Sequence, residues 1–486
     1  MTSRPGRSSL RGRAVPDEIG GELLRAVHLV GIGGAGMSAL ARVLLARGAA
    51  VSGSDIKDSR SLAALRAIGA DIFVGHDASN IGDSGSVVVS SAIPASNPEV
   101  RAARERALPI LQRAQVLALL MRSQRGIAVG GTHGKTTTTS MIAMVLRYAG
   151  LDPTFLIGGD LNEVGTNAHA GDGEWLVAEA DESDGSFLWL APEIAVVTNI
   201  EADHLDHYRD EAEIRETFLA FLGNLPETGK AILGIDDPGV GAIASRVGGT
   251  TISFGLTPGA DWAGEVLERG PSGQRVLVRH RGEPRGEVFL SVPGAHNVSN
   301  ALAALAVADA LGVPFETAAS ELASFAGVQR RFQVRGGAGG VTFVDDYAHH
   351  PTEVRATLAA AREQGWRRVV AVFQPHRYSR TLHLGSELGA ALASADRIIV
   401  TDVYGAGEEP IPGVSGHVVV DGVLNARPSA QVAYLPKPGD VPAFLAGRAE
   451  DGDLVLTIGA GDVTMLADEA IRAVEDRWNA RSGAGT

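Results

Sequence analysis

The sequence predicts an α/β fold with three units in series, and three observations lead to this prediction. The chain has 486 residues, which is too long for one ordinary domain. Short apolar runs alternate with helical patterns, as expected for parallel strands joined by crossover helices. Two of these runs lead into glycine-rich turns, at residues 31–36 and 130–134. A third α/β block follows Phe332.

The first block begins with the apolar run at residues 26–30, followed by a glycine-rich turn and a helical pattern over 37–47. The second block repeats this order, with a strand at 126–130 and a helix at 136–148. The other predicted elements are strands at 50–52, 71–74, 86–90, 175–178, 193–197, 341–344, 368–373, 397–401 and 454–458, and a helix at 61–68.

Composition excludes several classes of function. The net charge of −14 argues against nucleic-acid binding, which needs a basic surface. The sequence has no cysteine, so disulfides and thiolate chemistry are excluded. It also has no apolar run of eighteen residues and no secretory signal, so we expect no membrane span and a cytoplasmic location. Residues 1–24 are expected to form a disordered tail.

The second glycine-rich turn predicts a phosphate site. Residues 130–138 (GGTHGKTTT) lie between a strand and a helix, where backbone N–H groups and the helix N-terminus attract an anion. Lys135 is one of only four lysines in the chain. It would reach the outer phosphates of a nucleotide, and a threonine hydroxyl could hold Mg²⁺. The match to the general P-loop pattern is imperfect, because Val129 stands where its first glycine would fall.

Acidic and histidine residues follow later strands, at 178–184 (AEADESD) and 199–207 (NIEADHLDH). Carboxylates at the ends of parallel strands lie where α/β proteins bind ligands, and they suit Mg²⁺. A solvated acidic loop explains the first group equally well. The two Asp-His pairs of the second group favour metal binding or proton transfer.

The third block carries two comparable segments, at 345–353 (DDYAHHPTE) and 374–380 (QPHRYSR). Guanidinium groups suit carboxylates and phosphates, and carboxylates suit an ammonium group. An amino acid has both charges, so the two segments together are compatible with an amino-acid site.

The first glycine-rich turn leaves two interpretations open. Gly31, Gly33 and Gly36 match the pattern G-x-G-x-x-G, and Asp55 ends the next strand. This combination is typical of dinucleotide sites, so an NAD-dependent dehydrogenase is the rival hypothesis. The same geometry binds any diphosphate, including that of a UDP-sugar. The second phosphate loop disfavours the dehydrogenase, which has no use for it.

Taken together, these motifs resemble the Mur ligase family from about Ala26 to Val474. The resemblance rests on HLVGIGGAGMSALA, VSGSD, SSAIPASNPE, GTHGKTTTT, EADESDGSF, TNIEADHLDHY, PGAHNVSNALAA, FAGVQRRF, DDYAHHPTEV, FQPHRYSRT and DVYGAGEEP. So many motifs in one order over more than 400 residues are highly specific.

The resemblance implies three domains. They are a Rossmann-like UDP-substrate domain at 25–123, a central P-loop-type ATPase domain at 124–329 and a Rossmann-like amino-acid-binding domain at 330–480. It also implies a reaction, which in the branch most similar to this chain adds L-alanine to UDP-N-acetylmuramate. ATP phosphorylates the lactyl carboxylate, the amine attacks the acyl phosphate, and phosphate leaves. The cofactors would be ATP and Mg²⁺, the partners small molecules, and the chain a monomer or a homodimer.

The resemblance also assigns roles residue by residue. It implies ATP binding by Gly131, Thr132, His133, Gly134, Lys135, Thr136, Thr137, His296, Asn297, Asn300, Arg331 and Asp346. It implies UDP-substrate binding by Gly33, Gly34, Asp55, Ser91, Asn97 and Arg113, and amino-acid binding by His349, His376, Arg377 and Arg380. Thr136, Glu179 and His204 would bind the metal. The catalytic group would comprise Lys135, Glu179, His204, His349, Arg377 and Arg380.

One departure from the family separates its branches. Several Mur ligases use a carbamylated lysine after the Asp-His motif to hold a second Mg²⁺, but residues 201–229 contain no lysine. The alanine-adding branch is similar in lacking it. A recycling ligase that attaches a preformed tripeptide to the same UDP-sugar is the nearest alternative, and glycine or serine in place of L-alanine is a finer one.

Overall fold

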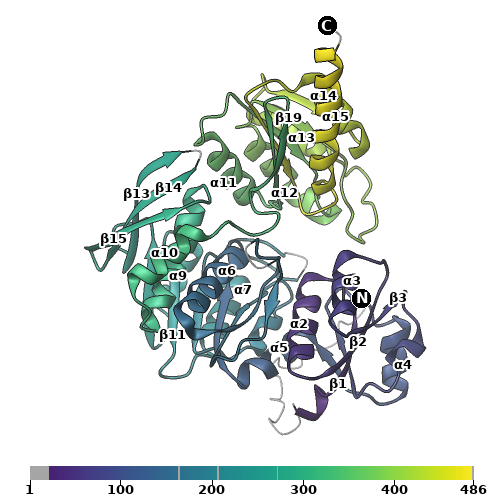
Figure 1. Ribbon diagram of the computed structural model, residues 1–486, viewed down its shortest axis with the longest axis vertical. Helices are drawn as coiled ribbons and strands as arrows, with labels where there is room; N and C mark the ends of the chain where they lie inside the picture. The colour runs from purple at the N-terminus through teal and green to yellow at the C-terminus, as the bar shows by residue number, and fades with distance from the viewer. Residues whose placement is uncertain (1–20, 163–164, 205–206, 271, 484–486) are drawn as a thin grey trace, which may run out of the picture. The chain divides into compact units, whose positions relative to one another are not determined.

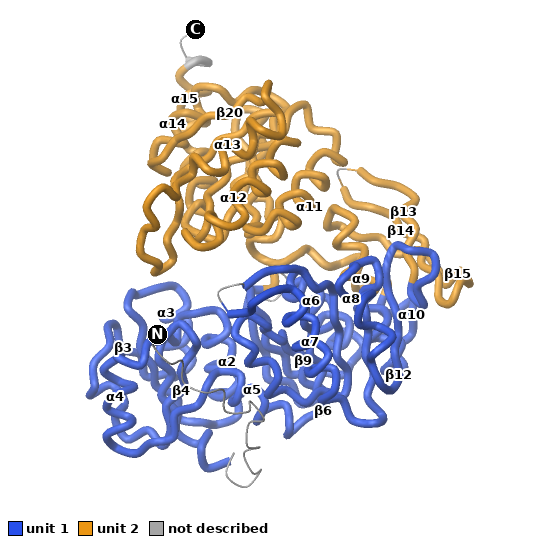
Figure 2. The backbone as a smooth tube through the Cα atoms, turned by 180° about the vertical axis from the view of Figure 1, so that it is seen from behind, with its two compact units in different colours: residues 1–160, 165–262, 303–318 blue, residues 161–164, 263–302, 319–486 orange. Residues whose placement is uncertain are grey.

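The structure is a computed structural model that describes residues 21–162, 165–204, 207–270 and 272–483. Most of the expected disordered tail, residues 1–20, lies outside the described residues. The chain divides into two compact units (Figure 2). Unit 1 comprises residues 1–160, 165–262 and 303–318, and unit 2 comprises residues 161–164, 263–302 and 319–486.

The first sheet of unit 1 has five parallel strands in the order β3-β2-β1-β4-β5 (Figure 1). The chain moves outward from β1 in one direction and then in the other, so the order switches between β1 and β4, which is where such sheets bind ligands. The elements are β1 (Ala26–Val30), α2 (Ala35–Ala46), β2 (Ala50–Asp55), α3 (Arg60–Ala67), β3 (Asp71–Val74), η1 (Ala78–Ile81), β4 (Ser86–Val89), α4 (Pro98–Glu105), β5 (Ile110–Gln112) and α5 (Arg113–Arg122).

A buried polar cluster lies inside this first sheet and its helices. Glu99 on α4 is fully buried. Its carboxylate accepts hydrogen bonds from Ser54 Oγ at 2.6 Å and Asn80 Nδ2 at 2.7 Å. His76 Nδ1 lies 3.0 Å and His28 Nε2 3.7 Å from the same carboxylate. Burial raises the pKa of Glu99, but His28, Ser54 and Asn80 outweigh it and lower the pKa to about 2.

The second sheet of unit 1 runs in the order β12-β11-β10-β6-β9-β7-β8. Its strands are parallel except β8, which is antiparallel to β7. The carboxyl ends of β6, β9 and β10 therefore meet at one edge. The strands are β6 (Arg125–Gly130), β7 (Thr154–Leu156), β8 (Ala168–His169), β9 (Trp175–Glu179), β10 (Ile194–Val197), β11 (Lys230–Gly234) and β12 (Thr250–Gly255). The helices are α6 (Lys135–Leu146), η2 (Arg147–Leu151), η3 (Ser186–Trp189), α7 (Glu211–Leu222) and α8 (Pro238–Ala244).

The helix predicted at 136–148 is a regular α-helix only as far as Leu146. Helix α6 ends at Leu146 and continues as the π-type turn η2, inside which Gly150 has a φ of 79°. Glycine adopts this left-handed conformation without a steric penalty, so the helix stops there.

Unit 2 contains a group of strands that the sequence did not predict, and two of them, β14 and β15, are antiparallel. They follow the order β15-β14-β13, with a bulge between Val278 and Arg279. Strand β15 has only two buried residues, so its sequence lacks the apolar run that indicates a strand. The elements of this stretch of the chain, in which residues 303–318 belong to unit 1, are β13 (Trp262–Gly270), β14 (Gly273–His280), β15 (Glu283–Leu290), α9 (Ala295–Ala310) and α10 (Phe315–Ser324).

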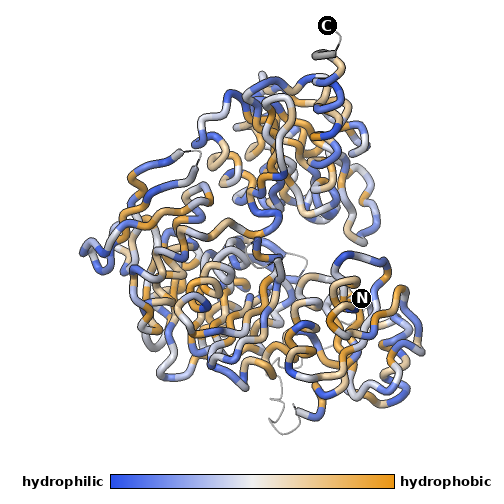
Figure 3. The backbone as a smooth tube through the Cα atoms, in the orientation of Figure 1, coloured by the Kyte–Doolittle hydropathy of each residue, from blue (hydrophilic) through white to orange (hydrophobic). Residues whose placement is uncertain are grey.

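The last sheet, also in unit 2, has the order β16-β17-β21-β18-β19-β20. Edge strand β16 is antiparallel to β17, and the others are parallel. Apolar clusters pack on its faces, and apolar residues gather along these strands in Figure 3. The elements are β16 (Gln333–Ala338), β17 (Val341–Asp346), α11 (Pro351–Arg362), β18 (Arg368–Phe373), α12 (Tyr378–Leu392), β19 (Arg397–Val400), α13 (His417–Ala426), β20 (Gln431–Tyr434), η4 (Pro438–Asp440), α14 (Val441–Arg448), β21 (Asp453–Ile458) and α15 (Thr464–Gly483).

Among the described residues, no helix combines the length and the apolar character needed to span a bilayer.

The buried carboxylate of Glu99 makes stability depend on pH. Its folded-state pKa of about 2 lies below its ordinary value of 4.5, so the charged form stabilises the fold above about pH 4.5. We expect Glu99→Gln to lower the free energy of unfolding at pH 7 by about 3 kcal/mol. Urea denaturation at a series of pH values should show this difference shrinking as pH falls below about 4.5.

Glu105→Gln is the matched control, because Glu105 ends the same helix and is exposed. It should change stability by no more than a few tenths of a kcal/mol, about the range of an exposed surface substitution. If the loss of unfolding free energy in Glu99→Gln stayed constant from pH 7 to pH 3, the charge on Glu99 would not be its cause.

Candidate active site

The phosphate loop forms the predicted connection between strand β6 and helix α6. Two of its glycines have left-handed φ angles, 134° at Gly131 and 81° at Gly134. A Cβ atom at Gly131 would lie 2.0 Å from Thr198 Oγ1, so only glycine fits this close approach. Helix α6 begins directly after Gly134. Its first N–H groups have no intrahelical acceptors and are available to a bound anion.

A neighbouring segment, residues 198–201 after β10, holds this loop in place. Asn199 accepts a hydrogen bond from His133 N at 2.7 Å and donates one to His133 O at 3.0 Å. Thr198 Oγ1 donates to the same carbonyl at 2.6 Å, and Glu201 N donates to Thr132 Oγ1 at 2.9 Å. The loop is therefore bonded to a second strand end along most of its length.

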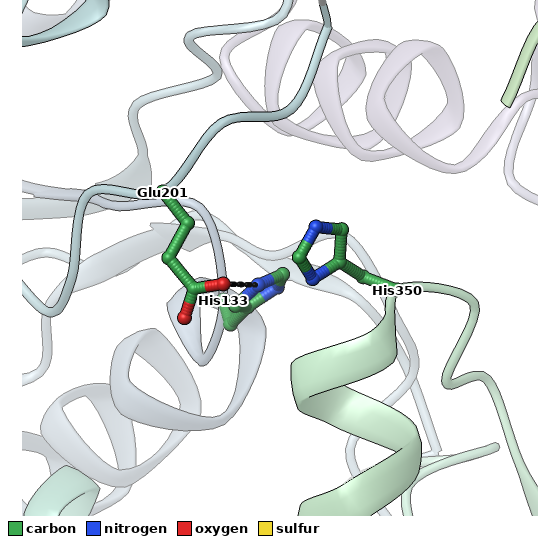
Figure 4. Close-up of side chains that lie close together, drawn as sticks. All are labelled: His133, Glu201 and His350. Carbon is green, nitrogen blue, oxygen red and sulfur yellow. Dashed lines mark ion pairs between the residues drawn. The ribbon is translucent and has the colours of Figure 1, made fainter. Parts of the chain in front are cut away.

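His133 also pairs with Glu201 through its side chain. The Nε2 atom lies 3.6 Å from Glu201 Oε2, and the two side chains face one another in Figure 4. His350, drawn in the same figure, belongs to unit 2 and caps the N-terminus of α11.

Lys135 is largely buried and points back along the phosphate loop. Its Nζ donates to Gly131 O at 2.5 Å and to Glu182 Oε1 at 2.9 Å. Burial lowers the pKa of Lys135, but Glu182 and Asp181 outweigh it and raise the pKa. The ammonium group thus stays charged at the place where nucleotide phosphates would bind.

The predicted metal ligands lie around the same strand ends. Thr136 is in the first turn of α6, and Glu179 ends β9, where its carboxylate accepts a bond from Gly158 N at 2.6 Å. These oxygen donors beside a phosphate loop fit Mg²⁺, which takes few protein oxygens together with water and phosphate. His204 offers nitrogen, which suits Mg²⁺ less. Its Nε2 lies 3.7 Å from Asp203 Oδ2 and 3.9 Å from Glu182 Oε1.

A cavity of about 580 Å³ lies within unit 1. Ser91, which follows β4, and Arg113, which begins α5, line it together with Asp184 and Tyr208 of the second sheet's loops. Arg113 Nη2 donates to Asp181 Oδ2 at 2.9 Å. The structure therefore places two of the predicted UDP-substrate residues, Ser91 and Arg113, on one cavity.

The other predicted UDP-substrate residues mainly support the first sheet. Asp55 accepts bonds from Gly33 N at 2.9 Å and Ile56 N at 2.8 Å, so it fixes the first glycine-rich turn from within. Gly34 precedes α2 as its N-cap residue. Asn97 is buried and caps α4 by accepting from Glu99 N at 2.9 Å. The side chains of Asp55 and Asn97 thus hold local structure.

The predicted adenine group begins helix α9 in unit 2. Asn297 and Asn300 are buried. Asn297 Nδ2 donates to Pro293 O at 2.7 Å, and Asn300 Nδ2 donates to Asn297 Oδ1 at 3.2 Å. Desolvation and the charge of Arg331 lower the pKa of His296 to about 4.

Arg331 precedes strand β16, and Asp346 ends strand β17. The Arg331 guanidinium lies over the Tyr347 ring, 5.2 Å from its centroid, and pairs with Glu353 at 3.7 Å. Asp346 is buried, and its two oxygens accept bonds from Phe332 N and Ala348 N, both at 2.8 Å. Burial raises the pKa of Asp346 to about 6. Both oxygens of Asp346 are thus engaged by the protein itself.

The predicted amino-acid residues gather around the N-terminus of α12. Arg377 is its N-cap residue, and Arg380 lies one turn later. Arg380 Nη1 lies 3.5 Å from His376 Nδ1, and the His376 and His349 rings meet edge to face with centroids 6.1 Å apart. Burial, aided by His349 and the two arginines, lowers the pKa of His376 to about 3. A neutral imidazole and two guanidinium groups therefore share one helix end.

Comparison with known proteins identifies the family. Three family models match in series: the Mur ligase family catalytic domain at 26–125, the Mur ligase middle domain at 129–308 and the Mur ligase glutamate ligase domain at 330–461. The chain belongs to the Mur ligase family. The prediction of three α/β domains in series is therefore confirmed.

Individual relatives show which members of the family the chain is similar to. The chain is 50% identical to the UDP-N-acetylmuramate–L-alanine ligase of Acidothermus cellulolyticus, over 94% of this chain and 96% of the relative. The crystal structure of the UDP-N-acetylmuramate–alanine ligase of Thermotoga maritima is 30% identical with a TM-score of 0.80, covering 93% of this chain and 99% of that one. The murein peptide ligase of Psychrobacter arcticus is 27% identical with a TM-score of 0.69, covering 93% and 98%.

In this Mur ligase, the structure adds residues to which the sequence assigned no role. Glu182 binds Lys135, although 47 positions separate them. Thr198 and Asn199 hold the phosphate loop from the end of the neighbouring strand β10. The sequence signal for these residues was their position after apolar strands, which indicates a ligand-binding edge but not the partner of each side chain.

Asn199 gives a direct test of how the phosphate loop is held. Asn199→Ala removes both hydrogen bonds to His133, so the loop should lose its fixed shape. We expect the KM for ATP to rise by about tenfold, which corresponds to roughly 1.4 kcal/mol for two hydrogen bonds. Steady-state phosphate release measured against ATP concentration provides the value.

Gln124→Ala is the control, since Gln124 also bonds a backbone carbonyl, Gly173 O at 2.8 Å, but at the opposite end of β6. It should leave the KM for ATP unchanged. An equal rise in both variants would mean that general loosening of the sheet, and not the loop, determines ATP affinity.

Proposed function

We propose that this chain is an ATP-dependent ligase that joins L-alanine to the lactyl carboxylate of UDP-N-acetylmuramate, a cytoplasmic step of peptidoglycan precursor synthesis. The observation that carries the proposal is the phosphate loop, in which a buried, charged Lys135 lies at the N-terminus of α6. The 50% identity to a relative of that name, over nearly the whole chain, supports the substrates.

The chemistry explains why ATP is needed. An amine does not attack a carboxylate at neutral pH, because the carboxylate has no adequate leaving group. Transfer of the γ-phosphoryl group to the lactyl carboxylate forms an acyl phosphate and ADP. The amine nitrogen of alanine then attacks the acyl carbon, and the tetrahedral intermediate expels inorganic phosphate. The protein contributes positioning and neutralisation of charge.

In unit 1, the residues of the phosphate loop would bind and orient ATP. Backbone N–H groups at the start of α6 face the phosphates, and Lys135 compensates the negative charge that develops on the γ-phosphoryl group. The cavity lined by Ser91 and Arg113 would bind the UDP-sugar. Arg113 carries a guanidinium group suited to a diphosphate or a carboxylate.

In unit 2, the N-terminus of α12 would bind the amino acid. Arg377 and Arg380 offer guanidinium groups to its carboxylate, and the helix N-terminus favours the same negative charge. His376 and His349 lie beside them. A neutral His376 offers a ring nitrogen that can accept a hydrogen bond from the amino group of the substrate.

Mg²⁺ is the cofactor we propose with ATP, held by Thr136 and Glu179, with His204 as a further candidate ligand. When bound, Mg²⁺ supplies positive charge to the transferring phosphoryl group. The absence of lysine between Glu201 and Gly229 excludes the carbamylated lysine of other family branches from that segment. The carboxylates of Asp203 and Glu182 lie 3.7 Å and 3.9 Å from His204 Nε2.

The tripeptide-recycling ligase is the second candidate function. The murein peptide ligase of Psychrobacter arcticus also covers almost the whole chain. Among the solved structures, the alanine ligase has the higher TM-score, 0.80 against 0.69, and a slightly higher identity, 30% against 27%. Membership of the Mur ligase family also favours a ligase over the NAD-dependent dehydrogenase. In addition, Asp55, which a dehydrogenase would use to bind ribose, is bonded to Gly33 and Ile56.

Phosphate release from ATP with Mg²⁺ tests the proposal. We expect release to require UDP-N-acetylmuramate and L-alanine together, and neither alone to suffice. Lys135→Ala should lower the rate by at least about 100-fold, because an essential positive charge is lost. Lys437→Ala, which removes an exposed lysine, is the control and should keep the parent rate.

Other outcomes have distinct meanings. Release that requires a tripeptide instead of L-alanine would assign the chain to the recycling reaction. Release with glycine or serine at comparable kcat/KM would widen the acceptor class. Absence of ATP turnover, together with tight NAD binding, would favour the dehydrogenase.

A further inference from the structure

An aromatic residue covers one side of the predicted amino-acid site. Tyr404 follows strand β19 and stacks on His376, with ring centroids 5.7 Å apart and an angle of 13° between the planes. His376 in turn meets His349, and His349 meets Tyr347 at 5.3 Å. The four rings form a continuous row, with Tyr404 at one end and Tyr347 at the other. No role was assigned to Tyr404 from the sequence.

The backbone of Tyr404 is bonded to the same segment. Its N–H donates to Pro375 O, and its carbonyl accepts from Arg377 N, both at 2.8 Å. Arg377 has a φ of 69°, a backbone angle that is unfavourable for residues other than glycine. The bond to Tyr404 O therefore helps to hold Arg377 in a strained conformation at the start of α12.

Tyr404 is 38% exposed, and its ring packs against Gly461 on one side. A Cβ atom on Gly461 would lie 2.8 Å from Tyr404 Cγ, so the absence of a side chain at 461 makes room for the ring. The same loop is also tied to α12 by Glu408, which accepts from Ser379 N at 3.0 Å and Ser379 Oγ at 2.6 Å. The loop 402–408 is thus bonded to the start of α12 at two points.

We propose that Tyr404 is a positioning residue for the amino-acid substrate, whose ring fixes the His376 imidazole and whose backbone fixes Arg377. The proposal rests on the proposed function. Burial is the largest cause of the lowered pKa of His376, and the stacked Tyr404 ring supplies part of that burial. Loss of the ring admits water to one face of His376, and its pKa then rises toward the ordinary histidine value.

Two substitutions separate the ring from the hydroxyl. Tyr404→Leu keeps apolar volume but removes the stacked ring, whereas Tyr404→Phe keeps the ring. We expect Tyr404→Leu to raise the KM for L-alanine by about tenfold and to leave the KM values for ATP and UDP-N-acetylmuramate within about twofold, in line with the worth of an aromatic contact. Tyr404→Phe should restore the parent KM.

The pH profile adds a readout that a merely structural role would not change. If neutral His376 is required, kcat/KM for L-alanine falls as pH drops through its pKa. The parent, with a His376 pKa of about 3, should show no such loss between pH 8 and pH 6. In Tyr404→Leu this loss should begin at a higher pH than in the parent, although His349 and the two arginines still lower the pKa of His376. Phe444→Ala, which removes a half-buried ring packed elsewhere in the same sheet's core, is the control and should keep the parent profile.

NMR titration of histidine-labelled full-length protein separates this proposal from the proposed function, because it needs no turnover. The His376 resonance is assigned by its absence from His376→Gln. A His376 pKa that rises in Tyr404→Leu and returns in Tyr404→Phe supports the positioning role. An unchanged His376 pKa, or KM values that rise equally for all three substrates, would overturn it. Lack of L-alanine-dependent phosphate release by the parent would instead overturn the proposed function.

Discussion

The site in unit 1 depends on keeping a lysine ammonium group charged while it is largely removed from water. An unpaired buried ammonium would lose its proton, since desolvation penalises the charged form. Here Glu182 and two loop carbonyls surround Lys135. The charge is thus present before any phosphate arrives, so nucleotide binding requires no new ionisation. Glu182 is nearly buried too, which keeps the pair from dissociating into solvent.

The same carboxylates connect two parts of unit 1. Asp181 binds Arg113, which lines the cavity, and its neighbour Glu182 binds Lys135 at the phosphate loop. Removal of water raises the pKa of Asp181, but Arg113 and Lys135 lower it overall. A ligand that draws Arg113 away from Asp181 would leave that carboxylate with Lys135 as its main cation. The charge on the cavity and the charge on the phosphate loop are therefore coupled through two adjacent residues.

Local sequence was enough to predict an element when its apolar pattern and its end signals lie within the element itself. The strand, glycine-rich loop and helix at 126–146 follow from an apolar run, three glycines and a helix start that are adjacent in the sequence. Strand β15 has few buried side chains, so it shows no apolar pattern. The pairing of Lys135 with Glu182 depends on the order of β6 and β9 in the sheet, which no local pattern specifies. The helix-capping bonds of Asn97 were also not foreseen, because the resemblance assigned this residue a substrate role and not a place in the fold.

Strained backbone in both units shows how the predicted sites are held. His204, Arg330, Phe332 and Arg377 all have left-handed φ angles. Each also donates its N–H to a fixed acceptor: Asp203 Oδ1, Gln333 Oε1, Asp346 Oδ2 and Tyr404 O, respectively. A left-handed residue costs about 1–2 kcal/mol, and one hydrogen bond contributes about 1 kcal/mol. The two are similar in size, so each conformation persists only while its acceptor stays in place. Asp346, Asp203 and Tyr404 therefore set backbone conformation at the edges of the predicted sites, and the placement of Phe332, His204 and Arg377 depends on them.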